Sequence, residues 1–309
     1  MPLKQTNIII IVIIASLAGW VSGCTAAAKP SATAVKTLTG LIQTVAPQVT
    51  LAPTPTEGPL AAKVNGEGVP LAVYQASLKD YQAAQVEQGQ KSTPDPTQQQ
   101  KAVLDDLVDQ VLLAQAATQA GHSVDDVAVQ ARLVQLASEA GDDQALAAWE
   151  NKNGYSADSF KAALQIQMAA TWESDQIIAA VPTTADQVHA RQILVFDPAI
   201  ADTIEQKLTS GSDFATLALK YDPQTSGDLG WFPKGYLTQP EVEAAAFSLQ
   251  VGKYSPVIHS KIGYHIIQVI ERDANHALSP DALQLFQHQA LQKWLSDQRG
   301  KAQIVVVSP

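Results

Sequence analysis

The sequence predicts an α+β protein in which a helical part is followed by a part with short strands. Before Pro182, apolar residues recur every three or four positions, which is typical of amphipathic helices. After Pro182, runs rich in β-forming residues alternate with Gly- and Pro-containing turns. Strand-like segments also occur before the first of these helices, at residues 62–69, and after the last turns, at residues 304–307. We therefore expect a helical body, a small sheet and a terminal strand.

The N-terminus has the features of a secretory leader. Lys4 precedes an apolar run from Ile8 to Val21. The run is shorter than the length that a membrane-spanning helix usually needs, but it is typical of a signal-peptide core. The sequence Val21-Ser22-Gly23-Cys24 follows and resembles the bacterial lipobox. The resemblance implies a signal peptide over residues 1–23 and a lipid-modified Cys24 that anchors the protein to the outer side of the cell membrane. The alternative is an uncleaved signal anchor.

Composition excludes several classes of function. Cys24 is the only cysteine, so a disulfide within the chain, a cysteine nucleophile or a cysteine-based zinc site is excluded. The net charge is −10 and no Lys/Arg-rich run occurs, which argues against nucleic-acid binding. The six histidines lack zinc-hydrolase spacing, and no phosphate-binding loop or nucleophile elbow is present. We expect no cofactor and no metal. A solute-binding lipoprotein is a weaker alternative, since the pattern does not suggest two large α/β lobes.

Residues 24–60 are expected to form a flexible tether, because Ala, Thr and Pro dominate there without apolar periodicity. A short strand over residues 62–69 with an Asn65-Gly66 turn follows, then a helix over residues 71–87. Residues 95–100 are polar and contain proline, so we expect a loop. Further helices are expected at residues 103–120 before a Gly121 cap, from a Ser123/Asp126 capping box to Gly141, at 146–151, and from Ser156 to Pro182.

The second part begins with a strand over residues 188–196, and Asp197-Pro198 then opens a helix. Residues 222–234 are rich in Gly and Pro and are expected to be a loop. The helix opened by Asp197-Pro198 is expected to end at Gly211. Three further helices are expected at residues 214–221, 240–249 and 280–298, and two strands at residues 262–271 and 304–307.

Four motifs in this second part resemble the parvulin family of peptidyl-prolyl isomerases and stand in the family's order. They are the strand Val188-His-Ala-Arg-Gln-Ile-Leu-Val195, the turn Ser226-Gly-Asp-Leu-Gly-Trp-Phe232, the element Ala246-Phe-Ser-Leu-Gln-Val-Gly252, and the closing strands with Ser255-Pro-Val257 and Gly263-Tyr-His-Ile-Ile267. The resemblance covers residues 184–273 and implies a small antiparallel sheet flanked by helices.

The flanking segments resemble the chaperones related to SurA and PrsA, in which helical segments enclose the isomerase. The resemblance implies a helical chaperone domain over residues 61–183. It also implies that residues 274–309 form a helix and a strand that return to that domain. The strand at residues 304–307 is then expected to pair with residues 62–64.

The parvulin resemblance implies a pocket that grips the proline ring. Rotation about a peptide bond must overcome a barrier of about 18–20 kcal/mol, and an apolar pocket favours the twisted amide because it has less charge separation than the planar one. The residues that the resemblance places in the pocket are Leu229, Phe232, Leu237, Val242 and Phe247. The alternative is that these side chains are ordinary core residues.

The same resemblance places three polar residues at the reacting bond. His265 corresponds to the family's C-terminal active-site histidine, and Asp222 to a position with an acidic or thiol side chain. Alternatively, His265 is a structural histidine and Asp222 a turn residue before Pro223. Gln192 stands where the family usually has a second histidine, and His189 cannot replace it because residues three apart on a strand face opposite sides. We expect activity to be retained in weakened form and to lack any pH dependence arising from residue 192.

The function expected is that of a peptidyl-prolyl isomerase and chaperone for unfolded or exported polypeptides that contain X-Pro bonds. The alternative is a non-catalytic holdase in which the parvulin fold serves only as a binding module. The Gln192 substitution keeps this alternative open.

Overall fold

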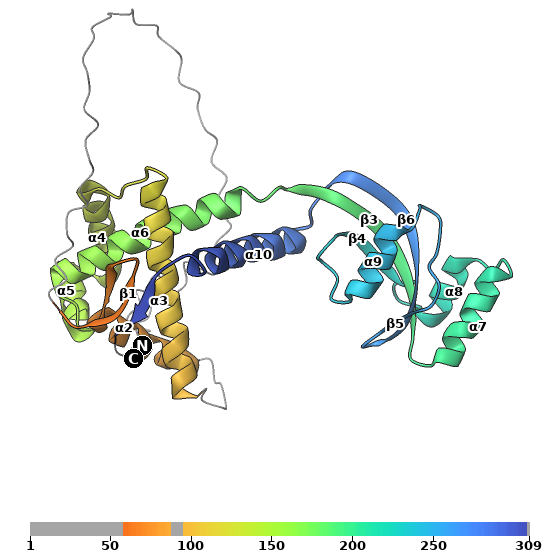
Figure 1. The fold of residues 1–309 in the computed structure, drawn as a ribbon, viewed down its shortest axis with the longest axis horizontal. Helices are drawn as coiled ribbons and strands as arrows, with labels where there is room; N and C mark the ends of the chain where they lie inside the picture. The colour runs from red at the N-terminus through yellow and green to blue at the C-terminus, as the bar shows by residue number, and fades with distance from the viewer. Residues whose placement is uncertain (1–57, 88–94, 308–309) are drawn as a thin grey trace, which may run out of the picture. The chain divides into compact units, whose positions relative to one another are not determined.

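The computed structural model describes residues 58–87 and 95–307, which form two compact units. The first unit consists of the described residues up to Ser174 together with those from Leu295 onward, and the second runs from Asp175 to Trp294 (Figure 1). Cys24 and the expected tether up to residue 57 lie outside the described residues. Within residues 58–87 and 95–307, no helix is both long enough and apolar enough to cross a membrane.

The first unit is mainly helical. Its central helix, α3, buries Val103, Leu107 and Val111 on one face, as the apolar spacing predicts. The other helices pack around this face and contribute to the same apolar core. In chain order the helices are α2 (Leu71–Glu87), α3 (Pro96–Gln119), α4 (Asp126–Ala140), α5 (Asp143–Lys152) and α6 (Ala157–Ala179).

A three-stranded antiparallel sheet completes the first unit, in the order β2-β1-β7. It joins β1 (Leu60–Val64), β2 (Glu67–Pro70) and β7 (Ile304–Val306). The expected pairing of the chain ends is confirmed, since Ala62 lies opposite Val306. The segment predicted as one strand is instead a hairpin. Asn65 and Gly66 at its turn both have positive φ, 52° and 89°, as the tightest hairpin turns require.

Two predicted boundaries in this unit are wrong. Residues 95–100 are not a loop, because Asp95 accepts a hydrogen bond from the Thr97 amide at 2.9 Å and α3 begins at Pro96. Proline at a first helical position loses nothing, since its missing N–H would have no partner there. The cap of α4 is not Ser123 but Asp125, which accepts from the Ala128 amide at 2.8 Å. Several capping residues stand next to each other in both places, so composition alone does not select one.

The second unit contains a four-stranded antiparallel sheet in the order β4-β3-β6-β5. Its strands are β3 (Thr184–Val195), β4 (Asp228–Pro233), β5 (Ile258–Ser260) and β6 (Gly263–Ala277), and its helices are α7 (Pro198–Thr209), α8 (Phe214–Tyr221) and α9 (Pro240–Ser248). Helix α10 (Pro280–Arg299) follows and continues past the boundary between the units.

Alternation along β3 and β6 divides the apolar side chains between the two faces of this sheet. Ile193, Val195 and Ile266 pack with α7 and α8. Val188, Ala190 and Ile267 point the other way and pack with α9. The sheet is therefore covered on both faces, and Figure 1 shows α9 and the α7–α8 pair on opposite sides of it.

The prediction of a loop over residues 222–234 is wrong, because β4 occupies part of it. Phe232 lies opposite Val188 at the edge of the sheet. An edge strand tolerates glycine and proline, so its sequence resembles a loop. Strands β3 and β6 are also longer than predicted. The added residues are mostly polar. A side-chain hydrogen bond joins the two extensions, because the buried Gln187 on β3 donates to the His276 carbonyl on β6 at 2.9 Å.

Candidate active site

A hydrogen-bonded triad with a buried histidine lies on the α9 face of the second unit's sheet. His265, on β6, is only 1% exposed. Its Nδ1 lies 2.9 Å from Oε1 of Gln192 on β3. Its Nε2 lies 2.7 Å from the hydroxyl of Ser260 at the end of β5. Three adjacent strands thus hold the imidazole from both sides, and the structure brings two of the predicted polar residues together.

The hydrogen bonds around His265 are compatible with a neutral imidazole. Gln192 Oε1 can only accept, so Nδ1 carries the proton. Ser260 Oγ accepts from the Ile262 amide at 3.1 Å and still has a hydroxyl proton that can donate to an unprotonated Nε2. Burial lowers the pKa of His265, with a smaller opposing contribution from Glu241. The triad is therefore uncharged at neutral pH.

Ser260 was not among the predicted site residues. It is 6% exposed, and a buried hydroxyl needs a partner, which His265 supplies. In the sequence, Ser260 stands just before the Lys261-Ile262 turn of a hairpin, where serine is common for conformational reasons. No sequence signal separates it from an ordinary turn serine.

The five predicted pocket residues all lie in one apolar cluster beside the triad. The ring centroids of Phe232 and Phe247 are 6.1 Å apart in an edge-to-face arrangement. Phe232 and Val242 are almost completely buried, so they form the floor of the cluster. The remaining members are more accessible: Leu229 and Leu237 are half-buried, and Phe247 is 9% exposed.

Strand register connects this cluster to the triad. Ile258, which packs against the cluster, lies directly opposite His265 in the β5–β6 pair. Ile267, two residues after His265 on the same face of β6, is a buried member of the cluster. An apolar surface and a neutral polar group therefore adjoin on one side of the sheet.

A carboxylate fixes the loop that carries Leu237. Glu243 on α9 accepts hydrogen bonds from the amides of Gly235, Tyr236 and Leu237 at 2.7, 3.0 and 3.0 Å. Gly235 has a φ of +87°, a conformation that favours glycine. Glu243 was also missed in the sequence, where it resembles any acidic residue in the first turn of a helix.

Asp222 caps the C-terminal end of α8 and organises the turn that follows. Its carboxylate accepts from the amides of Gln224 and Thr225, each at 3.1 Å, and from the Thr225 hydroxyl. These bonds, the Thr225 hydroxyl first among them, lower the pKa of Asp222. The hydrogen bonds of its carboxylate in the described structure all come from residues 224–227, so these contacts are those of the turn residue considered as the alternative.

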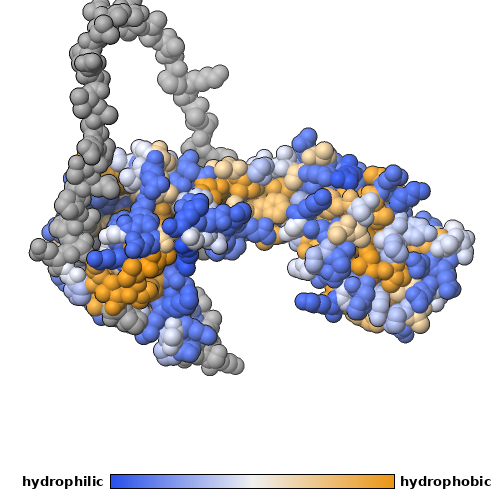
Figure 2. All heavy atoms as spheres, in the orientation of Figure 1, coloured by the Kyte–Doolittle hydropathy of each residue, from blue (hydrophilic) through white to orange (hydrophobic). Residues whose placement is uncertain are grey.

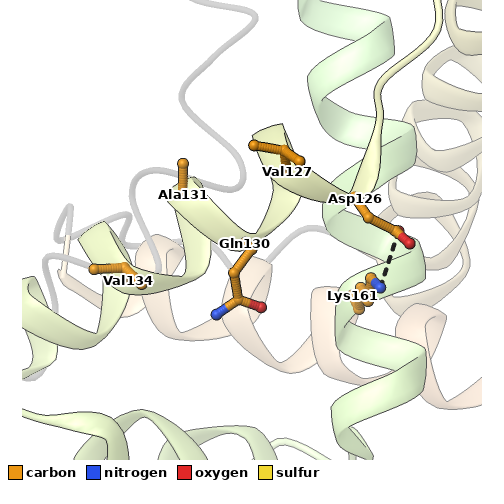
Figure 3. A pocket seen from close by; sticks show the side chains of 6 residues that line it. All are labelled: Asp126, Val127, Gln130, Ala131, Val134 and Lys161. Carbon is orange, nitrogen blue, oxygen red and sulfur yellow. Dashed lines mark ion pairs between the residues drawn. The ribbon is translucent and has the colours of Figure 1, made fainter.

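The helical unit presents a second candidate surface. Figure 3 shows a shallow hollow along α4 that is bordered by Val127, Ala131 and Val134, with an ion pair of 3.0 Å between Asp126 and Lys161 at one end. Val127 is 77% exposed and Val134 is 59% exposed. Hydrophobic side chains are visible at the surface of both units in Figure 2. Nowhere in residues 58–87 and 95–307 do three His, Cys, Asp or Glu side chains stand together as metal ligands would.

Comparison with known proteins finds two family models that each match a segment of the chain. Residues 197–271 match the PPIC-type PPIase (rotamase) domain, and residues 51–164 match the SurA-like N-terminal domain. The foldase protein PrsA of Caldanaerobacter subterraneus subsp. tengcongensis is 46% identical over 86 residues, which is 26% of this chain and 28% of that protein. The chaperone SurA of Methylobacillus flagellatus is 32% identical over 145 residues, 40% of this chain and 33% of that protein.

Among solved structures, the PrsA peptidyl-prolyl isomerase of Bacillus cereus aligns with 64% of this chain and 77% of that chain, at 27% identity and a TM-score of 0.42. The sequence alignments to the PrsA and SurA proteins named above span about a third of those proteins' length.

Proposed function

We propose, from a PPIC-type rotamase domain joined to a SurA-like N-terminal domain, that this protein is a peptidyl-prolyl cis-trans isomerase and chaperone for exported polypeptides. One observation carries the proposal: the apolar cluster around Phe232 and Phe247 adjoins the neutral triad of His265, Gln192 and Ser260 on one face of the sheet. The functional division that we propose is a chaperone domain at residues 61–183, an isomerase domain at 184–273 and a returning segment at 274–309.

The chemistry requires no covalent step. The proline ring would rest on Leu229, Leu237 and Phe247, above the floor of Phe232 and Val242. Twisting the amide reduces its charge separation, so an apolar, partly dehydrated surface stabilises the transition state more than the planar ground state. We assign His265, Gln192 and Ser260 to the polar side of the site. Asp222 is kept as a proposed site residue, and its contacts support a role in shaping the turn that leads to β4.

The test is catalysed refolding of a substrate whose folding is limited by proline isomerisation, a step that takes about 10–100 s without a catalyst. The full chain should shorten the slow phase, and Phe247→Ala should remove most of the acceleration. His265→Ala should weaken it. Leu219→Ala, at an exposed position on α8, is the control and should leave the rate unchanged. No acceleration by the unmodified chain, with aggregation still suppressed, would contradict the isomerase proposal.

The second candidate is a holdase that binds unfolded chains on its helical unit. It is favoured by the exposed apolar stripe of Val127, Ala131 and Val134 on α4. Contiguous apolar surface of this kind commonly marks an interaction site. Replacing Val127 and Val134 by Asp should reduce suppression of aggregation and leave peptide isomerisation intact. Equal suppression by the variant would remove α4 from the binding surface.

We further propose that Cys24 carries the lipid that holds the protein at the extracytoplasmic face of the membrane. The lipobox-like Val21-Ser22-Gly23-Cys24 sequence supports this location. Acyl chains contribute about 0.8 kcal/mol per buried methylene, so two or more give stable anchoring. Cys24→Ser should abolish incorporation of labelled fatty acid and release the protein from the membrane fraction. Retention of the label would refute Cys24 as the acceptor.

A further inference from the structure

Lys234 places an ammonium group at the edge of the apolar cluster. Its Nζ lies 5.1 Å from the centroid of the Phe247 ring, within the range of a cation–π interaction. The residue directly follows β4 and its side chain is exposed. A ligand resting on Phe247 would therefore lie next to a positive charge.

The backbone around Lys234 is held in place. The next three amides all donate to the Glu243 carboxylate on α9, the helix that also carries Phe247. Lys234 therefore stands at a defined position relative to the ring, and only its side chain is free to adjust. A lysine whose backbone is fixed beside the ring can contact a bound ligand in a reproducible way, as a specificity residue must.

The neighbouring charges already have partners. Arg272, whose guanidinium lies 5.7 Å from the Phe247 ring centroid, binds both carboxylate oxygens of Asp186 at 3.1 and 2.7 Å. The pKa of Asp186 is lowered, first by the Arg272 hydrogen bond and to a smaller extent by Arg272 and Lys234 electrostatically. Glu243 is occupied by three amides. Lys234 itself forms no ion pair with any described residue and acts on Asp186 only over a longer distance, so its ammonium group can still pair with a ligand.

We infer that Lys234 makes the site favour X-Pro segments with an acidic side chain adjacent to the proline. The inference rests on the proposed function and names its preferred substrates. Exposed ion pairs contribute little free energy, so the preference for Glu over Lys at the adjacent position should be about two- to fivefold. It should also weaken at high salt, because the pair is accessible to solvent.

Two series of tetrapeptides test the inference with the full chain. One varies the residue before proline and the other the residue after it, each as Glu, Gln or Lys. Binding is measured by fluorescence anisotropy of labelled peptides and isomerisation by exchange NMR spectroscopy. The Glu peptide should bind best and the Lys peptide worst in at least one series. Lys234→Glu should reverse that order in the same series.

Lys220→Glu is the matched control. Lys220 also lies over an aromatic ring, 5.7 Å from the centroid of Tyr221, but on α8, which packs on the other face of the sheet. It should leave the order unchanged. Acceleration without a charge preference, or a preference that Lys234→Glu leaves intact, would overturn this inference alone. A charge preference in binding without acceleration would support it and overturn only the isomerase proposal.

Discussion

At the scale of single residues, the pair formed by His265 and Gln192 determines the charge of the candidate site. A glutamine oxygen accepts the Nδ1 proton but does not titrate, and burial lowers the pKa of His265 itself. The imidazole is neutral above its usual pKa of about 6.5 and stays neutral somewhat below it. Any activity of this site should therefore be insensitive to pH in the neutral range.

Introducing a second histidine at position 192 tests whether the triad is neutral. For the unmodified chain, kcat/KM for a neutral X-Pro peptide should be constant between about pH 6.5 and 8. Gln192→His should introduce a titration in that range, because the new imidazole would share one proton network with His265. The measurement is the pH profile of isomerisation by exchange NMR spectroscopy, with Gln192→Glu as a second variant. A titration already present in the unmodified chain would refute the neutral triad.

Gly227 is a second residue with a defined role. Its φ is +70°, and a Cβ atom there would lie 1.9 Å from the Gln192 carbonyl oxygen. The Gln192 amide in turn donates a hydrogen bond to the Gly227 carbonyl. Backbone cannot move aside as a flexible side chain can. Gly227 thus lets the turn before β4 approach the strand that carries Gln192.

Gly227→Ala should therefore destabilise the second unit by more than about 3 kcal/mol, combining conformational strain with a steric clash. Gly211→Ala is the matched control, since Gly211 also has positive φ but no atom within 4 Å of its virtual Cβ. It should cost only about 1 kcal/mol. Urea unfolding monitored at the tryptophans would measure both. Equal losses would show that the contact with Gln192 contributes nothing.

At the scale of secondary-structure elements, local pattern predicts helices better than edge strands. The bounds of α8 match the prediction, because its buried Phe214, Leu217 and Ala218 follow helical spacing and Asp213 caps it. Strand β4 was missed because its glycine and proline hide the strand pattern. It is a strand only because β3 supplies hydrogen-bond partners from distant sequence. Long-range pairing of this kind leaves no local trace.

The candidate site divides in the same way. Family motifs placed Gln192, His265 and all five apolar residues, and the structure brings these seven side chains to one face of the sheet. The contacts made by Ser260 and Glu243 depend on how a hairpin and a loop fold back. Neither residue type nor spacing distinguishes those two from residues with purely local roles.

Helix α3 carries two carboxylates with opposite expected effects on stability. Burial, first among several causes, raises the pKa of Asp106 to about 6. Asp109 accepts a hydrogen bond of 2.6 Å from Nε of Arg299, at the end of α10. Since the folded-state pKa of Asp106 exceeds its unfolded value, its contribution to stability is greatest below about pH 4 and is lost as the pH rises through about 6.

Asp106→Asn should therefore stabilise the first unit at pH 7.5 by about 1–3 kcal/mol and have little effect near pH 4. Asparagine retains an oxygen that can accept the hydrogen bond from Gln110, so the local structure should persist. Asp109→Asn is the contrasting variant and should destabilise, because it removes a partner of Arg299. Denaturant unfolding at the two pH values checks the sign. Destabilisation by Asp106→Asn at pH 7.5 would contradict the pKa assignment.

At the scale of the whole molecule, the two ends of the described chain meet in one sheet. Ala62 lies opposite Val306, and the Asn65 amide donates to the Gln303 carbonyl at 2.9 Å. The first unit is therefore discontinuous in sequence, with the whole second unit inserted between Ser174 in α6 and Leu295 in α10. Folding of the helical unit must close this long loop, which is entropically costly.

Removing β7 by truncation after Lys301 tests how far this closure matters. The truncation leaves the inner edge of β1 without its partner and takes away the hydrogen bonds at Asn65, so the amides of β1 and β2 should lose protection from hydrogen exchange. Strands β3 and β6 pair with each other over most of their length and take no residue from β7. Their amides should keep their protection.

Hydrogen-exchange mass spectrometry of the full and truncated chains measures both regions in one experiment. The truncated chain retains Arg299 and its contacts with Asp105 and Asp109, so these ion pairs are not lost with β7. Equal loss in β3 and β6 would mean that the terminal strand stabilises the entire protein, and unchanged β1 would mean that the closing pair contributes no stability.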